Sequence, residues 1–251
     1  MNELSSDIYK FSSLEIGESI ISGRLLKFNN PAFFNDPFDC DVDLLEFDFR
    51  DWSSDVDEDF KKVKSILEKD LGNRTESIIR QISEVDIIEM YKQSQLDKIA
   101  RSAICCFTKD FKNTIMWSHY ANNHKGVCLN FDLSVSNPFF DDLVGQFGQG
   151  SVNYNDYTPV NYFKSKQKAL EKLFYTKSKD WEYEAEYRFF TLQEHGLYRF
   201  KTEFLKGVIF GIRVPLREID RFKRVCEKQG FSHVYFKKLI KDKLNIRVEY
   251  V

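Results

Sequence analysis

The chain has 251 residues and a net charge of −2, with 42% hydrophobic and 30% charged residues. These values are ordinary for a soluble globular protein, and a chain of this length buries roughly 70–75% of its unfolded surface without a disulfide or metal. The small net charge gives no global reason to bind nucleic acid, although a local basic face is compatible with it. No apolar run approaches the roughly 20 residues of a membrane span, so we expect no membrane-spanning helix.

The aromatic and cysteine residues indicate the kind of interior and the compartment. The chain contains 24 Phe and 12 Tyr, which favour a sheet-containing core and clefts with flat walls. The five cysteines are an odd number, and the N-terminal segment MNELSSDIYKF has no apolar signal-peptide region. We therefore expect free thiols in a reducing cytoplasm.

The first 101 residues predict two strands around a helix and then a long helical segment. The predicted elements are a strand at 8–11, a helix capped by Ser12 or Ser13 that ends at Gly23, a strand at 24–28, a turn at 33–40 and a helical insertion at 41–101. Within the turn, Pro37 keeps Asp36 out of helical geometry. The start of the insertion is acidic, which is typical of a solvated face and compatible with a partner surface.

The rest of the chain alternates strands with short helices. The predicted elements are strands at 103–107 and 126–131 around a short helix at 114–121, a mobile glycine-rich loop at 137–151, a short strand at 152–154, a basic amphipathic helix at 164–175, strands at 181–192 and 207–211, a helix from Pro215 to about 229, and strands at 233–236 and 246–250. The glycine-rich loop lacks the strand–turn–helix context of a dinucleotide-binding motif, so a Rossmann fold is rejected. The order predicts one α+β domain over residues 1–251.

Two late glutamates form the first candidate site. On a strand, Glu184, Glu186 and Arg188 would share one face, with Tyr183, Ala185 and Tyr187 on the other. Neighbouring carboxylates repel, and the arginine would relieve that repulsion. The pattern is compatible with an exposed ion-pair ladder of little energetic weight. It is also compatible with a functional carboxylate pair, in which one member stabilises developing positive charge or binds a substrate hydroxyl.

The segment 104–132 concentrates histidine, tryptophan and cysteine. On one helix His119 and His124 would lie about 140° apart, so they would not share a metal as residues four apart do. His119 could instead be a core histidine that forms a hydrogen bond with the backbone. Cys105, Cys106 and Cys128 fit apolar strands as small core residues.

A metal site has a possible acidic donor set elsewhere. Asn35, Asp36 and Asp39 could bind a divalent cation together with Glu186, as in a nuclease. The same Asn-Asp-Pro sequence equally suits a turn with side-chain caps.

Three blocks in this order resemble a widespread bacterial family known as domain of unknown function 2971. The blocks are Phe34-Asn35-Asp36-Pro37-Phe38-Asp39, then Met116-Trp117-Ser118-His119-Tyr120-Ala121 with His124 and Gly126, then Trp181-Glu182-Tyr183-Glu184-Ala185-Glu186-Tyr187-Arg188. The resemblance extends over residues 9 to about 211. It implies an association with phage defence and abortive infection.

The layout is also similar, more remotely, to that of ADP-ribosyltransferases, which cleave the nicotinamide–ribose bond of NAD. This resemblance implies that Glu186 is the reacting carboxylate and Glu184 its partner. It also implies an aromatic wall from Tyr120 or Trp117 and a phosphate contact from Arg188 or Lys10, where the family usually has His or Arg on the first strand. The complete expected site has Glu186, Glu184 and His119 as catalytic residues and Tyr9, Lys10, Asn35, Asp36, Trp117, Tyr120, His124 and Arg188 as binding residues.

We therefore expect a cytoplasmic defence-type effector with an α+β fold that resembles ADP-ribosyltransferases, built on a mixed or antiparallel sheet core with a helical insertion. It would transfer ADP-ribose from NAD to a nucleic acid or protein, or hydrolyse NAD. One alternative is a metal-dependent nuclease built on Asp36, Asp39, His119 and Glu186. The other is a non-catalytic module that binds a ligand or partner in an aromatic cleft.

Overall fold

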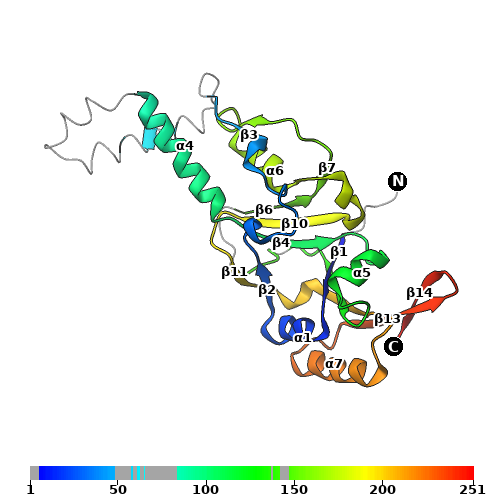
Figure 1. Ribbon diagram of the computed structural model, residues 1–251. Helices are drawn as coiled ribbons and strands as arrows, with labels where there is room; N and C mark the ends of the chain where they lie inside the picture. The colour runs from blue at the N-terminus through cyan, green and yellow to red at the C-terminus, as the bar shows by residue number, and fades with distance from the viewer. Residues whose placement is uncertain are drawn as a thin grey trace.

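An eight-stranded sheet organises the fold of the computed structural model, which describes residues 6–48, 58, 61–62, 65, 84–136, 138–141 and 147–251 (Figure 1). Its strands are β1 (Asp7–Ser12), β4 (Ala103–Thr108), β5 (Val127–Asp132), β6 (Phe147–Ser151), β10 (Glu186–Thr191), β12 (Leu205–Phe210), β13 (Tyr235–Asp242) and β14 (Asn245–Tyr250). They lie in the order β14-β13-β12-β5-β1-β4-β10-β6, with only β12 and β13 paired in parallel. The prediction of an α+β protein with a mixed, mostly antiparallel sheet is confirmed.

Helices and short strands complete the described part. The helices are α1 (Leu14–Gly23), α4 (Glu84–Ala100), α5 (Thr114–Tyr120), α6 (Lys166–Phe174) and α7 (Leu216–Lys228), with 3-10 turns η1 (Pro31–Phe33), η2 (Val42–Leu44), η3 (Lys179–Glu184) and η4 (Thr202–Phe204). The short strands pair as β2 (Leu25–Phe28) with β11 (Gly196–Arg199), β3 (Leu45–Glu46) with β8 (Val160–Asn161), and β7 (Asn153–Tyr154) with β9 (Thr176–Lys177). None of the helices among the described residues is long and apolar enough to cross a membrane.

The two faces of the sheet are covered by different helices. Helices α1 and α7 pack side by side on one face (Figure 1), where Ile219, Phe222 and Cys226 recur at helical spacing and are buried. Helix α5 covers the other face, because Trp117 packs against Phe11 of β1 with ring centroids 5.0 Å apart. Successive side chains of β1 and β5 point to opposite faces of the sheet and therefore contribute to two separate apolar clusters.

The sheet opens between its two central strands. Strand β1 pairs with β5 over six positions but with β4 at one, Tyr9 with Thr108. The backbone ladder is therefore interrupted beside Lys10 and Cys106, and the side chain of Lys10 donates to the carbonyl oxygen of Cys106 at 2.7 Å. This opening is the place where the chain forms a pocket.

The predicted mobile loop at 137–151 is wrong for its final third. Residues 147–151 form strand β6, which pairs antiparallel with β10 at the edge of the sheet. A Cβ at Gly148 would lie 2.4 Å from the Phe190 ring, and one at Gly150 would lie 3.2 Å from the Tyr175 ring. The glycines therefore let an edge strand approach two aromatic rings, which the loop interpretation did not consider. Residues 137 and 142–146 lie outside the described part.

The predicted strand at 181–192 is wrong in its first part. Residues 179–184 form the 3-10 turn η3, and Ala185 follows with the left-handed φ of 43° before β10 begins. The alternation of side chains along a strand therefore does not determine the direction of the Glu184 side chain. The turn brings Glu184 back towards Glu186 instead, and both are buried rather than exposed as a ladder would be.

The predicted insertion at 41–101 contains helix α4 at its end. Near its start, Leu45–Glu46 forms strand β3, which pairs with β8 instead of continuing as helix. Apart from residues 58, 61–62 and 65, the segment 49–83 lies outside the described residues. The prediction of a single domain over residues 1–251 stays a prediction.

Gly126 joins α5 to β5 where two backbone segments meet. A Cβ there would lie 2.1 Å from the carbonyl oxygen of Ser12 and 2.9 Å from that of Ala121. Because both neighbours are backbone atoms, no side-chain rotation relieves the clash. We expect Gly126→Ala to lower the free energy of unfolding by about 3 kcal/mol in urea titrations. Gly196→Ala is the matched control, since its Cβ would meet nothing closer than 4.0 Å. Equal losses in the two variants would contradict this account.

Candidate functional site

A pocket of about 360 Å³ lies at the opening between β1 and β4. Several elements supply its walls, including β1, β4, α5, β9, η3 and β10. Its lining residues are Tyr9, Lys10, Phe11, Asn29, Phe33, Phe34, Asn35, Asp39, Ile104, Cys106, Phe107, Thr108, Met116, Tyr120, Lys177, Glu184 and Glu186. Aromatic walls around a few convergent polar groups are typical of a small-molecule site.

Arg188 anchors the charged side of this pocket from below. Its side chain is fully buried, and its two terminal nitrogens donate to the two Asp39 oxygens at 2.8 and 2.7 Å. Nε and Nη2 donate to the Glu186 carboxylate at 2.9 and 2.8 Å, and Nη1 also donates to the carbonyl of Phe174 at 2.9 Å. The planar guanidinium thus holds two carboxylates in defined orientations.

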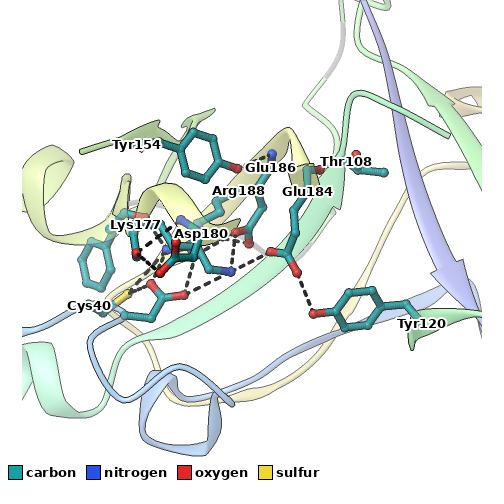
Figure 2. A network of polar contacts seen from close by, with 12 residues as sticks. Cys40, Thr108, Tyr120, Tyr154, Lys177, Asp180, Glu184, Glu186 and Arg188 are labelled. Carbon is teal, nitrogen blue, oxygen red and sulfur yellow. Dashed lines mark hydrogen bonds and ion pairs between the residues drawn. The ribbon is translucent and has the colours of Figure 1, made fainter. Parts of the chain in front are cut away.

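Lys177 is the second buried cation of the cluster. Its ammonium lies 2.7 Å from Glu184 and 3.1 Å from Glu186 (Figure 2). It also lies 3.6 Å from Asp39 and 4.9 Å from the centre of the Trp181 ring. Burial by itself would lower the pKa of Lys177, but the carboxylates of Glu186 and Glu184 raise it above its usual range. The ammonium is therefore charged throughout the physiological pH range.

The Glu186 carboxylate is a permanent anion in this setting. Burial would raise its pKa, but Arg188 and then Lys177 outweigh burial and lower the pKa to about 2. Glu186 therefore does not serve as a proton donor near neutral pH. It can stabilise positive charge that develops beside it in the pocket.

Glu184 has one cationic and one neutral hydrogen-bond partner, unlike Glu186. Its Oε1 accepts a hydrogen bond of 2.7 Å from the hydroxyl of Tyr120, while Oε2 accepts from Lys177 (Figure 2). Tyr120 comes from α5 and is partly exposed. The backbone of the turn is fixed by Thr108, whose hydroxyl donates to the Glu184 carbonyl. One carboxylate oxygen thus faces a neutral, solvent-accessible donor.

Six of the residues expected from the sequence line the pocket together. They are Tyr9, Lys10, Asn35, Tyr120, Glu184 and Glu186. Arg188 lies buried beneath them, so it orients carboxylates and is not offered to a phosphate. Asp36 is buried next to the pocket, where Oδ1 accepts the N–H of Phe38 at 3.0 Å, as the turn interpretation expects.

Three other expected residues lie elsewhere. Trp117 is fully buried in the core and donates to the carbonyl of Phe111, so its ring does not form the pocket wall. His119 is exposed on α5 and does not line the pocket, because the helix turns its inner face towards β1 with Met116 and Trp117. His124 lies beyond the helix, 3.1 Å from the Ser118 hydroxyl and stacked on Trp117.

The residues of the nuclease alternative do not gather around one point. Asp39 and Glu186 direct their oxygens at Arg188, and His119 lies on an exposed helix face. Among the described residues, no group of three or more His, Cys, Asp or Glu is arranged to hold a metal ion. The oxygens of these two carboxylates thus already accept hydrogen bonds from Arg188 and Lys177.

Sequence reasoning missed several members of the site. Lys177 and Phe33 carried no motif, and Asp39 was considered only as a metal ligand. A signal for Lys177 existed, because it directly follows the run Leu173-Phe174-Tyr175-Thr176, and a lysine buried with such a run requires a partner of opposite charge. Cys106 lines the pocket, whereas Cys105 and Cys128 are buried as expected, and all the cysteines are free.

Comparisons with known proteins add one assignment. A search of curated proteins and a search of solved structures find no match. One protein-family model matches a segment that begins in α5, ends in β10 and contains Tyr120, Lys177, Glu184, Glu186 and Arg188. This model is described as protein of unknown function (DUF2971), and the matched residues are 116–189.

Proposed function

We propose that the pocket binds NAD and cleaves the bond between nicotinamide and ribose. The observation that carries the proposal is the position of two carboxylates, Glu184 and Glu186, inside one aromatic-walled pocket. Cleavage of this bond leaves positive charge on the ribose, and a fixed anion nearby stabilises that charge. The remote resemblance of the sequence to ADP-ribosyltransferases supports the same proposal.

The two glutamates have different roles in this proposal. Oε1 of Glu184 accepts a hydrogen bond from a ribose hydroxyl. This bond replaces or accompanies the 2.7 Å hydrogen bond that Oε1 accepts from Tyr120. Glu186 holds its negative charge in place through Arg188 and Lys177. Bound ligand and fixed charge are thereby aligned before the bond breaks.

Aromatic side chains would hold the nicotinamide ring. Phe34 and Phe33 line the pocket from the loop after β2, and the ring of Phe33 is 80% exposed. Tyr9 and Tyr120 line it from β1 and α5. Planar rings stack on such surfaces with little loss of side-chain freedom.

The reaction needs an acceptor for the ribosyl group. The C–N bond to nicotinamide breaks, its electron pair leaves with nicotinamide, and an oxygen or nitrogen nucleophile attacks the ribose carbon and loses a proton to solvent. Water as the nucleophile gives NAD hydrolysis, whereas a group of a nucleic acid or protein gives ADP-ribosyl transfer. We further propose a cytoplasmic defence-type effector role, which the free cysteines and the family resemblance support.

Free nicotinamide tests this proposal directly. We expect release of nicotinamide from NAD by the purified protein, alone or with cell lysate as a source of acceptor, and loss of release in Glu186→Gln. Metal-dependent cutting of plasmid or RNA that EDTA abolishes would support the nuclease instead. If neither activity occurs and NAD binds without turnover, the pocket is a ligand-binding module. In that case, induced expression should not arrest growth.

A further inference from the structure

The C-terminal part of the chain is basic although the whole protein is slightly acidic. Residues 213–251 contain eleven Lys or Arg and five Asp or Glu, against a net charge of −2 for the full chain. These residues form α7 and the antiparallel ribbon of β13 and β14. The ribbon is the outermost part of the sheet, with β14 at its edge (Figure 1).

One face of the ribbon combines cations with aromatic rings. Lys237 lies opposite Tyr250 in the register, and Lys241 lies on the same face four residues further along the strand. The Lys237 ammonium is 4.5 Å from the centre of the Tyr235 ring and 4.7 Å from that of Tyr250. The ring of Tyr250 is 73% exposed. A flat ring with an adjacent cation is therefore available to a ligand.

The tip of the ribbon carries further free charge. Lys241 and Lys243 are exposed, and no carboxylate of the described residues lies within ion-pair distance of either. Arg247 is also exposed and has Glu249 at 2.9 Å. The positive charge on this ribbon is thus only partly neutralised by the protein.

Helix α7 lies behind the other face of the ribbon. The ammonium of Lys223 lies 5.6 Å from the centre of the Phe236 ring, and Phe236 alternates with Lys237 along β13. Arg224 and Lys228 are exposed on this helix. The cations of α7 are therefore not part of the face that carries Lys237 and Tyr250.

We propose that the β13–β14 ribbon binds single-stranded nucleic acid through its tip and the face that carries Lys237 and Tyr250. Phosphates would contact Lys237, Lys241 and Lys243, and a base would stack on Tyr250. Cations interleaved with exposed aromatic rings are the combination that binds single strands without sequence preference. This inference concerns a surface separate from the pocket and does not depend on NAD cleavage.

An anionic membrane is the competing occupant, because Leu244 at the ribbon tip is fully exposed. A single apolar side chain with Asp242 and Asn245 nearby offers little area to a bilayer. The observations therefore favour nucleic acid.

Binding can be measured by fluorescence anisotropy with a short labelled oligothymidylate and the full chain, in the absence of NAD. Because each phosphate contact on a single strand contributes about 0.7 to the slope of log K against log salt, Lys241→Ala/Lys243→Ala should reduce that slope by about 1.4. Lys27→Ala/Lys168→Ala removes the same charge from β2 and α6 and should leave the slope unchanged. Tyr250→Ala should weaken binding about fivefold or more, while Tyr250→Phe retains it.

Three results would overturn the inference. One is no binding at about 50 mM salt, where such contacts are strong. Another is an equal effect of the ribbon and control double variants. The third is binding to phosphatidylserine vesicles but not to the oligonucleotide, lost in Leu244→Ser, which would assign the ribbon to a membrane surface. Melting temperatures of all variants check that each remains folded.

Discussion

Replacing Arg188 with alanine is expected to lower the free energy of unfolding by about 3–5 kcal/mol. The guanidinium is fully buried and supplies four hydrogen bonds to Asp39 and Glu186 together. Its removal leaves both carboxylates buried, with Lys177 as their remaining cationic partner. An uncompensated buried charge costs far more than the net stabilisation of the intact pair.

Urea titrations at neutral pH measure this loss. Arg217→Ala is the matched control, because that side chain is 84% exposed and its ion pair among the described residues is with neighbouring Glu218 at 3.4 Å. We therefore expect a change within about 0.5 kcal/mol. A stability of Arg188→Ala within about 1 kcal/mol of the parent would show that the cluster is not anchored by this residue.

The same variant should change the pH dependence of stability. Because the folded-state pKa of Glu186 is lowered to about 2, its contribution is fully present above the unfolded value near 4.5 and is lost as pH falls towards 2. Without Arg188 the folded pKa rises, and the acid-dependent loss attributable to Glu186 becomes smaller. Urea titrations of Arg188→Ala and the parent, from neutral pH down to the pH at which the protein unfolds, measure this difference. The same dependence of unfolding free energy on pH in both proteins would contradict the assignment.

A large loss of activity with little loss of stability is expected for Glu184→Gln. If Glu184 orients the ribose and contributes negative charge, its amide should reduce kcat/KM for nicotinamide release by on the order of 10²- to 10³-fold. The amide oxygen can accept from Lys177 while the amide NH2 donates to the hydroxyl oxygen of Tyr120, and Lys177 keeps Glu186 and Asp39 as partners. The stability of this variant should therefore remain close to that of the parent.

Two further variants separate charge from folding. Glu186→Gln should lose both activity and stability, because Arg188 then lacks one of its two carboxylates. Tyr120→Phe removes one hydrogen bond to Glu184 and keeps the ring, so it should have the smallest effect on both. Full activity in Glu184→Gln, measured as nicotinamide by liquid chromatography, would remove Glu184 from the proposed reaction.

Local sequence patterns predicted most of the elements that surround the pocket. The cap at Ser13 and the helix to Gly23, the strand at 103–107 and the helix after Pro215 follow from residue spacing and terminal signals. The glutamates at 184 and 186 could be selected because carboxylates beside aromatic residues are a recognisable candidate site. Their secondary structure could not be derived, since the left-handed Ala185 breaks the alternation on which the strand prediction depended.

The sequence by itself determined the α+β class, the alternation of apolar strands with short helices, and the candidate carboxylates. Only the tertiary structure decided what each charged or aromatic side chain does. Trp117 fills the core because Phe11 of β1 lies against it, and Arg188 is buried because Asp39, 149 residues away, neutralises it. The physical reason is that the pairing of buried charges depends on contacts between distant segments, which residue spacing along the chain does not encode.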